Sequence, residues 1–261
     1  MLQFSANLSL LFKEYPLIER FAAARRAGFD AVEIQFPYEL TIAQIQQQLT
    51  QHHLKLVLIN VPAGDLMQGG NGLACVPKQE HHFRMAVMEA LSYADALGVK
   101  RINVLAGRQP QNSDLLHCLH TLAHNLHYAA ESFQAIGAIT TFEAINTFDM
   151  PGFLVKSVAD MQEMLEAVNH PALKMQFDCY HMARMGEDLA SALPENIGHI
   201  GHIQFADVPD RHQPNTGTLD YASLFRLIDA LPYDGYCGAE YHPTGLTADS
   251  LQWFEPYRSL P

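Results

Sequence analysis

Short apolar runs alternate with longer segments of helical periodicity eight times along this chain of 261 residues. The apolar runs, which we predict to be strands, lie at residues 2–6, 31–35, 55–60, 101–105, 139–144, 174–178, 200–205 and 236–240. The predicted helices lie at residues 16–27, 41–52, 79–97, 113–136, 157–168, 184–192, 221–230 and 246–256. Strict alternation is typical of parallel β/α proteins, and eight units predict a closed (β/α)8 TIM barrel.

The size and composition of the chain agree with one such barrel. Barrels of this kind typically take about 250 residues. Hydrophobic residues make up 48% of the chain and charged residues only 17%, which provides material for a continuous core. Since no segment has the composition of a linker, we expect residues 1–261 to form a single TIM-barrel domain.

The balance of charge restricts the partners of the protein. The formal net charge is −12 and the pI is about 5.5. Nucleic-acid backbones are bound by surfaces rich in Lys and Arg, so an acidic chain argues against a nucleic-acid partner. A small anionic substrate would have to be met by a few local cations. The four cysteines contain no CxxC pair, which indicates reduced thiols rather than a disulfide framework.

Targeting signals are not evident in the sequence. The start, MLQFSANLSLLFKEYP, lacks the basic region of a signal peptide and reaches Lys13 and Glu14 early. No later run approaches the ~18 apolar residues of a membrane-spanning helix. These observations predict a cytoplasmic protein without a membrane partner.

Four predicted strands end on side chains that can bind a metal ion through oxygen. These are Glu143, Asp178, Gln204 and Glu240, separated by 35, 26 and 36 residues. Each interval suits one strand plus one helix, and the carboxyl ends of parallel barrel strands meet on one face. The four side chains should therefore converge.

The donor set indicates which metal would bind. Three carboxylates and one amide oxygen suit Mg²⁺ or Mn²⁺, whereas zinc favours His and Cys. The alternative is that the acids pair with Lys or Arg, but the nearby strand sequences offer few cations. Since unpaired buried carboxylates are costly, a divalent metal is the preferred interpretation.

Such a site could isomerise a hydroxycarbonyl compound. The metal would stabilise an enediolate, while Glu143 and Glu240 remove and return the proton. His181, three residues after Asp178, is expected to hydrogen-bond a substrate oxygen. For a substrate carboxylate, Arg108 and Arg211 are the candidate cations because each follows a predicted strand; Arg184 is expected only to cap or solvate its helix.

Two further features interrupt the regular pattern. The Gly-rich connection at residues 60–77 is longer than the usual two to six residues of a βα loop, and we expect it to be a lid. His117, His120, His124 and His127 share one helical face, where His120 and His124 could bind a divalent ion. Because a barrel helix lies away from the strand ends, we expect this face to be solvated or to contact another subunit.

Several motifs resemble the hydroxypyruvate isomerase family, within the xylose-isomerase-like TIM barrels. They are GFDAVEIQFP (28–37), NVPAGD (60–65), GLACVP (72–77), FDCYHMAR (177–184), HIQFADVPDRHQPNTG (202–217) and GAEY (238–241). The resemblance covers essentially the full chain. It implies that Glu143, Asp178, Gln204 and Glu240 hold the metal and that the two glutamates are the acid/base pair.

The resemblance also restricts the substrate class. Related sugar epimerases place a His where this chain has Gln204, so this position favours the isomerase branch; His202, two residues earlier, remains a possible ligand or supporting group. The implied substrates are small anionic hydroxycarbonyl acids, either hydroxypyruvate with tartronate semialdehyde or a four-carbon 2-oxotetronate.

Three alternatives stay open at this stage. A ketose 3-epimerase of neutral sugars would use the same metal and glutamates. A non-catalytic metabolite-binding barrel would bind a ligand without exchanging its protons. An apurinic endonuclease of the same fold would need a His-rich multi-metal centre and a basic groove, which the acidic composition disfavours. A homo-oligomer is compatible with the sequence.

Overall fold

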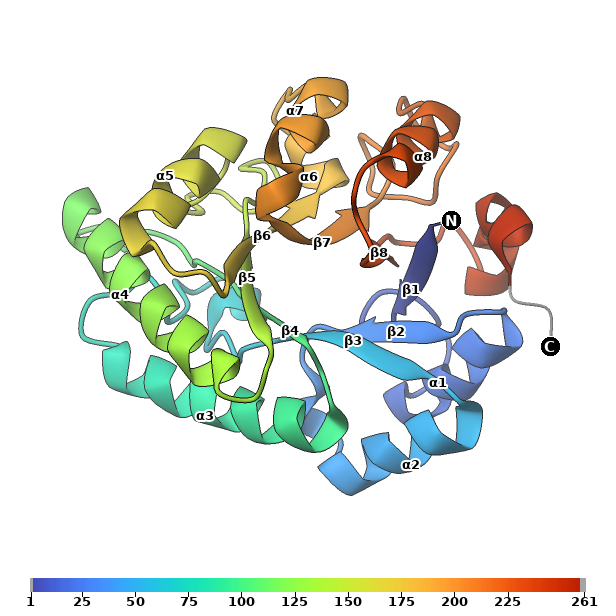
Figure 1. The fold of residues 1–261 in the computed structure, drawn as a ribbon, viewed down its shortest axis with the longest axis horizontal. Coiled ribbons are helices and arrows are strands. Elements are labelled where there is room, and N and C mark those ends of the chain that lie inside the picture. Colours follow the sequence, from blue (N-terminus) through green and yellow to red (C-terminus); the bar gives the residue numbers. More distant parts are fainter. Residues whose placement is uncertain (1, 259–261) are drawn as a thin grey trace.

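The computed structural model describes residues 2–258 and contains a closed barrel of eight parallel strands (Figure 1). The strands pair in sequence order, and β8 pairs with β1 to close the barrel. Their bounds are β1 Gln3–Asn7, β2 Ala31–Ile34, β3 Lys55–Asn60, β4 Arg101–Val104, β5 Ile139–Glu143, β6 Leu173–Asp178, β7 Ile200–Phe205 and β8 Tyr236–Ala239. The predicted TIM barrel is therefore confirmed.

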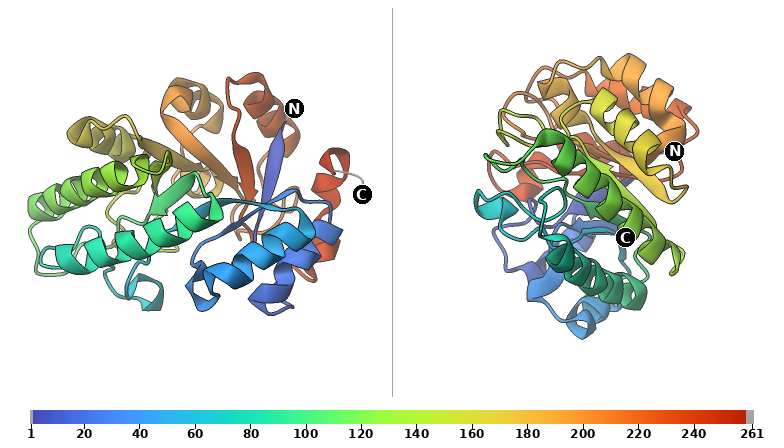
Figure 2. Two further views of the ribbon diagram at one scale, coloured as in Figure 1. Left: turned by 60° about the horizontal axis from the view of Figure 1, so that its bottom comes forward. Right: turned by 90° about the vertical axis from the view of Figure 1, so that its left-hand side faces the viewer.

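Helices surround the strands, and α3 and α4 lie side by side on one flank (Figures 1 and 2). The α-helices are α1 Leu17–Arg26, α2 Ile42–His52, α3 Glu80–Leu97, α4 Leu115–Gln134, α5 Val158–Val168, α6 Cys179–Arg184, α7 Leu189–Asn196 and α8 Tyr221–Ala230. Short 3-10 helices lie at Pro37–Glu39, Leu66–Gln68, Ile197–His199, Thr247–Ser250 and Gln252–Tyr257. Within residues 2–258, no helix combines the length and apolar character needed to cross a bilayer.

Two helix predictions were wrong. The single helix expected at residues 184–192 is replaced by α6 and α7, because Asp178 and Asp188 each cap a separate helix and Gly186, at φ 85°, lies between them. The helix expected at residues 246–256 consists of two 3-10 helices, the second of which contains Pro256. Proline removes a backbone donor, which disfavours a continuous α-helix there.

Local capping explains where several other helices begin. Thr41 accepts a hydrogen bond from the Gln44 backbone, and the Gln44 side chain accepts one from the Thr41 backbone, which completes a capping box at α2. Asp114 and Ser157 cap α4 and α5 through a single hydrogen bond each, which one side-chain oxygen accepts from a backbone N–H of the first turn. These residues satisfy amides that the first turn of a helix leaves without partners.

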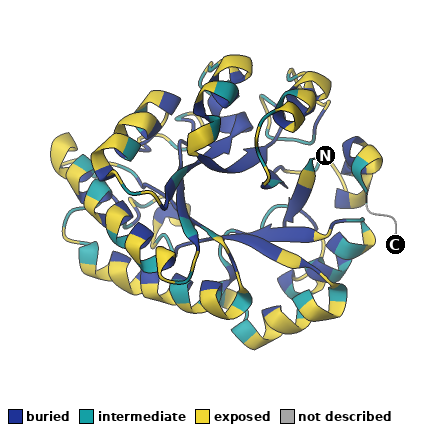
Figure 3. Ribbon diagram, viewed as in Figure 1, coloured by how far each residue is buried: buried dark blue, intermediate teal, exposed yellow. Residues whose placement is uncertain are grey.

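Most strand residues are buried (Figure 3). The outward-facing and inward-facing side chains of the strands differ in polarity. Outward-facing Phe4 and Phe205 pack against Phe225 of α8, so the layer between strands and helices is apolar. On the other face, Glu33 of β2 bonds Gln204 of β7, although these strands are not neighbours. This bond must cross the barrel interior. The interior-facing side chains therefore include a polar network, in contrast to the branched apolar layers common in such barrels.

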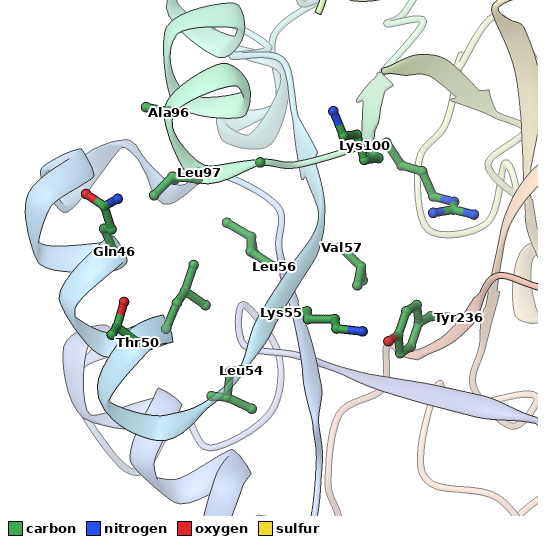
Figure 4. Close-up of a pocket in the computed structure, with 13 residues that line it drawn as sticks. Gln46, Thr50, Leu54, Lys55, Leu56, Val57, Ala96, Leu97, Lys100 and Tyr236 are labelled. Carbon is green, nitrogen blue, oxygen red and sulfur yellow. The ribbon is translucent and has the colours of Figure 1, made fainter. Parts of the chain in front are cut away.

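A cavity of about 480 Å³ opens at the opposite end of the barrel from the strand-end acids (Figure 4). Its lining includes Lys55, Arg101 and Tyr236, which are the first residues of β3, β4 and β8. No carboxylate occurs among the described residues that line it. The chemistry predicted from the sequence thus belongs to the other face, where the strands end.

Candidate active site

Barrel closure places the predicted ligands at adjacent strand ends. Glu143 and Asp178 are the last residues of β5 and β6, and Glu240 directly follows β8. Gln204 of β7 is the register partner of Asp178, and its other neighbour, Gly238, precedes Glu240 by two residues. All four side chains are buried, with 5% exposure or less. The structure therefore places all four residues at the carboxyl-terminal ends of neighbouring strands, and their convergence on one metal ion stays a prediction.

Glu143, Asp178 and His181 offer ligand atoms that all lie within 4.8 Å of one another. Asp178 Oδ1 accepts a hydrogen bond from the backbone N–H of Tyr180. Asp178 Oδ2 is buried and has no hydrogen-bond partner. A buried carboxylate oxygen without a donor is costly, so this atom is suited to a cation.

The pKa of Glu143 is shifted towards neutral pH. Burial and the neighbouring Asp178 raise the pKa of its carboxyl group to about 7. Asn103 Nδ2 donates a hydrogen bond to Glu143 Oε1 at 2.8 Å and orients the carboxyl group. This bond lowers the pKa of Glu143, but by less than burial and Asp178 raise it. At neutral pH both protonation states of Glu143 are thus accessible, as an acid/base group requires.

Glu240 is held by three donors. Its Oε1 accepts from Gln35 Nε2 at 2.8 Å and from Arg211 Nη2 at 2.7 Å, and its Oε2 accepts from Asn7 Nδ2 at 3.1 Å. Burial raises the pKa of Glu240 well above its ordinary value, and Arg211 only partly opposes this. The carboxyl group is therefore positioned firmly while remaining able to carry a proton.

Arg211 lies between two of the acids. Its Nη2 is 3.7 Å from Asp178 Oδ2 as well as 2.7 Å from Glu240 Oε1, and its guanidinium packs over the ring of Tyr180. Glu240 itself lies outside the 4.8 Å group of Glu143, Asp178 and His181. The alternative in which strand-end acids pair with a basic residue is thus realised by Arg211.

The loop that carries Arg211 is anchored by Asp207. Both carboxylate oxygens of Asp207 accept backbone N–H groups along the loop, including those of Gly217 and Leu219. A Cβ atom at Gly217 would lie 1.9 Å from the Val208 carbonyl oxygen, so only glycine fits there. Asp207 therefore folds the β7–α8 connection into the shape that directs Arg211 to the acids.

The hydrogen bonds of Asn146 define the tautomer of His181. Asn146 Oδ1 accepts from the backbone N–H groups of Phe148 and Asp149, so its Nδ2 is the atom that faces His181 Nδ1 at 2.7 Å. Since Nδ2 can only donate, His181 Nδ1 must accept, and the ring proton lies on Nε2. Burial lowers the pKa of His181 well below its ordinary value. His181 is thus a neutral donor whose Nε2 lies 3.5 Å from Asp178 Oδ2.

Gln204 is held from two sides. Its Nε2 donates to Glu33 Oε1 at 2.7 Å, and its Oε1 accepts from Gln176 Nε2 at 2.7 Å. His202 also bonds Glu33, through Nε2 at 2.8 Å. Burial is the largest single influence on Glu33 and raises its pKa. The charge of His202 and the hydrogen bonds from His202, Gln204 and Ser5 together outweigh burial, so the pKa of Glu33 is lowered overall. His202 therefore contacts a buried carboxylate in the supporting role considered from the sequence.

Arg108 has different partners from Arg211. Its guanidinium donates to the carbonyl oxygens of Leu66, Gly70 and Pro151. It thereby anchors the long connection at residues 60–77 in this structure. A contact between Arg108 and a substrate carboxylate, and a lid movement of this connection, both stay predictions.

Two other predicted features lie on the surface. His117, His120, His124 and His127 are all exposed on α4, as expected for an outer barrel helix. Arg184 lies under the ring of Phe148, with 4.7 Å between its guanidinium carbon and the ring centroid. Among the described contacts, neither feature reaches the strand-end acids.

The polar side chains that orient the acids were not predicted from the sequence. Asn7 ends β1, Glu33 and Asn103 lie within β2 and β4, and Asn146 follows β5 by three residues. A polar residue within a fully buried strand was the available signal, because burial requires a hydrogen-bonding partner. The identity of each partner depends on strands far apart in the sequence.

The model of the xylose isomerase-like TIM barrel family matches residues 21–257. The chain is 42% identical to 2-oxo-tetronate isomerase of Cupriavidus necator over 257 residues, covering 98% of this chain and 99% of the relative. It is 41% identical to hydroxypyruvate isomerase of Escherichia coli over 260 residues, covering 99% and 100%. A crystal structure described as an AP endonuclease, family 2, from Brucella melitensis superposes with a TM-score of 0.96 at 38% identity, covering 99% and 100%.

Proposed function

The chain belongs to the xylose isomerase-like TIM barrel family and is an isomerase of small hydroxy-keto acids, and we propose that it works through an enediolate with a divalent metal ion. The relatives named for hydroxypyruvate and for 2-oxo-tetronate are almost equally similar to it. The proposed substrate is therefore a three- or four-carbon α-hydroxycarbonyl acid.

One observation carries the proposed mechanism. Glu143 and Glu240, from strands on opposite sides of Asp178 and Gln204 in the barrel order, are both buried and both have raised pKa values. Carboxyl groups with pKa values near the working pH exchange protons efficiently with carbon acids. Glu143, with a pKa of about 7, is such a group, and the pKa of Glu240 is raised in the same direction by burial; a pair of such carboxyl groups favours proton transfer between neighbouring carbons of a substrate.

The proposed steps conserve every atom of the substrate. One glutamate removes a proton from the carbon that bears the hydroxyl group, and the electron pair forms the C=C bond of an enediolate. A proton then returns to the neighbouring carbon, from the other glutamate or from the same one. The hydroxyl proton moves to the former carbonyl oxygen, which gives the isomeric hydroxycarbonyl acid. When the same glutamate returns the proton, the enzyme is regenerated directly. When the other glutamate supplies it, the first then releases its proton to solvent and the second takes one up, which regenerates the enzyme.

The residues fit a divalent cation. Asp178 Oδ2 is buried and accepts no hydrogen bond, although Arg211 Nη2 and His181 Nε2 lie 3.7 and 3.5 Å away, and Glu143 lies within the same group of ligand atoms. We propose that Glu143, Asp178, Gln204 and Glu240 hold Mg²⁺ or Mn²⁺, since an oxygen-only set suits these ions. When bound, the ion would supply positive charge that stabilises the negative charge developing on the substrate oxygens.

Two further residues would bind the substrate. His181 presents a neutral Nε2–H, which suits donation to a hydroxyl or carbonyl oxygen that becomes negative during the reaction. Arg211 is the cation that contacts the strand-end acids, and its guanidinium suits the carboxylate of the substrate. Both residues lie on segments that directly follow strands.

A direct assay tests this function. Hydroxypyruvate, four-carbon 2-oxo acids and free ketoses should be compared with Mg²⁺ or Mn²⁺ present, with product formation followed in deuterated water. We expect turnover of one of the acids with incorporation of solvent deuterium. Turnover of free ketoses alone would favour the 3-epimerase, and tight binding without deuterium incorporation would favour a non-catalytic barrel.

The similarity to the Brucella structure makes endonuclease activity the competing proposal. The net charge of −12 disfavours it, because a phosphate backbone requires a basic groove. Incubation with DNA that contains an abasic site, with Mn²⁺ or Zn²⁺, tests it directly. Cleavage of that DNA without isomerase turnover would overturn the proposed isomerisation.

A further inference from the structure

Glu33 is the centre of a hydrogen-bond network beneath the strand-end acids. Its Oε2 accepts from Ser5 Oγ and His202 Nε2, each at 2.8 Å. Its Oε1 accepts from Gln204 Nε2 at 2.7 Å and from Asn7 Nδ2 at 3.0 Å. A carboxylate offers about four acceptor positions, so every position of this fully buried side chain is filled. The donors come from β1 and β7, the two strands that pair with β8.

This arrangement determines which way the Gln204 amide points. An amide can present either its oxygen or its nitrogen to a neighbour, but a carboxylate only accepts hydrogen bonds. The Nε2 atom of Gln204 therefore faces Glu33, and the Oε1 atom of Gln204 faces away from Glu33. Gln176 Nε2 occupies one lone pair of that oxygen, which leaves the second available. With a neutral partner in place of Glu33, both orientations of the Gln204 amide would be possible.

The same carboxylate is linked to Glu240. Asn7 Nδ2 donates both to Glu33 Oε1 at 3.0 Å and to Glu240 Oε2 at 3.1 Å. The Asn7 amide is itself oriented, because its Oδ1 accepts from the backbone N–H of Ser9. Glu33 thus contacts the proposed ligand Gln204 directly and the proposed acid/base group Glu240 through one intermediate residue.

The backbone leaves room for Glu33 at one specific point. A Cβ atom at Gly238 of β8 would lie 2.4 Å from Glu33 Oε2 and 2.5 Å from Glu33 Oε1. The φ angle of Gly238 is not in the left-handed region, so close approach rather than backbone conformation requires glycine here. Glycine at position 238 therefore leaves the space that the carboxylate of Glu33 occupies.

We propose that Glu33 is a positioning residue that holds the Gln204 oxygen towards the metal site and supports Glu240 through Asn7. This inference rests on the proposed function, because it requires Gln204 to be a metal ligand. It adds that a carboxylate from β2, outside the ligand set, determines the affinity of the site. Partners that orient metal ligands typically contribute about 10- to 100-fold to metal affinity.

A double-mutant cycle with Glu33→Gln and Gln204→Ala tests the inference. Metal-free wild type, both single variants and the double variant are titrated with Mn²⁺ by calorimetry. We expect Glu33→Gln to weaken Mn²⁺ binding about 10- to 100-fold. In the Gln204→Ala background the same change should have a clearly smaller effect, because the contact with Gln204 is already lost and only the link through Asn7 to Glu240 remains.

Ser5→Ala is the matched control. It also removes a hydrogen bond to Glu33, but from Oε2 rather than from the oxygen that faces Gln204. We expect its Mn²⁺ affinity to stay within about threefold of wild type, whereas its melting temperature without metal should fall in line with one lost hydrogen bond. A purely structural role of Glu33 would lower the melting temperature of Glu33→Gln without changing its Mn²⁺ affinity, and this result would overturn the inference.

The remaining outcomes separate this inference from the proposed function. Equal effects of Glu33→Gln with and without Gln204 would show that Glu33 does not act through Gln204 and would overturn the inference alone. A wild-type protein that binds no Mn²⁺ would overturn the proposed metal site and the inference together. If Glu33→Gln does not fold, Gly238→Ala displaces the carboxylate while retaining its charge; unchanged Mn²⁺ affinity in a folded Gly238→Ala protein would also overturn the inference.

Discussion

The Nη2 atom of Arg211 lies 2.7 Å from the Oε1 atom of Glu240, so a guanidinium directly contacts a proposed proton-transfer group. The same nitrogen lies 3.7 Å from Asp178 Oδ2. Arg211 therefore compensates part of the negative charge that barrel closure gathers at one point. We expect the same cation to bind the carboxylate of the substrate.

Replacement of Arg211 by Ala should raise KM strongly while the protein remains folded. A charge-assisted hydrogen bond contributes about 1.5–3 kcal/mol, which corresponds to an increase in KM of about 10- to 150-fold. Arg108→Ala is the comparison, since Arg108 contacts three backbone carbonyls in this structure. Steady-state kinetics and thermal melts of both variants check this prediction. Unchanged KM in both variants would mean that the carboxylate binds elsewhere or that the substrate has none.

Glu143→Gln and Glu240→Gln should each lose most activity. Each substitution removes a proton-transfer group and a charged ligand, and acid–base catalysis alone contributes roughly 10²- to 10⁴-fold in rate. Turnover at saturating substrate and Mn²⁺ is the measurement, with circular dichroism to verify folding. A folded variant that keeps more than about a tenth of wild-type turnover would contradict the assigned role.

Asn146→Ala should impair the reaction through His181. Loss of the Nδ2 donor at 2.7 Å leaves only the longer contact of 3.5 Å from the backbone N–H of Asn146 to hold the His181 proton on Nε2. We expect a fall in kcat/KM of about tenfold, as for the loss of one hydrogen bond of about 1–1.5 kcal/mol. Nitrogen NMR of His181 should show the Nε2–H tautomer in wild type and a mixture in the variant. A single unchanged tautomer in Asn146→Ala would refute this explanation.

Removal of metal by a chelator should abolish isomerisation and lower the melting temperature. An ion that binds only the folded protein stabilises it by about 2.7 kcal/mol at 100 times its Kd. Addition of Mg²⁺ or Mn²⁺ should restore both properties, and Asp178→Asn should weaken this recovery. Full activity after exhaustive chelation, with no metal found by elemental analysis, is the result that the proposed mechanism cannot accommodate.

The metal-free protein should lose stability as the pH rises towards neutrality. Burial and Asp178 raise the pKa of Glu143 from 4.5 to about 7, so the folded state binds a proton more tightly than the unfolded state between these values. Stability therefore falls with rising pH across this window, because ionisation is less favourable in the folded protein. Urea unfolding in chelator at several pH values is the measurement. Glu143→Gln should show a flatter dependence, and an equally steep one would assign the effect to other groups.

Much of the barrel was predictable because its information is local. The strand at residues 200–205 and the helix at residues 221–230 were predicted with their observed bounds. The strand-end acids were also predictable, since parallel strands bring their carboxyl ends to one face. The failure at residues 184–192 arose where two short helices follow each other, each with its own aspartate cap.

The sequence by itself determined the eightfold β/α alternation and placed Glu143, Asp178, Gln204 and Glu240 at the ends of four strands, because side-chain periodicity and strand length are properties of short segments. Only the tertiary structure decided that Arg211 rather than Arg108 contacts the acids, that Asn146 defines the tautomer of His181, and that Glu33 orients Gln204. These contacts join residues from separate strands and loops. The contacts of Arg211 and Asn146 need neighbouring strands to pair, and the contact of Glu33 with Gln204 crosses the closed barrel. In this buried interior each donor and acceptor must find a partner.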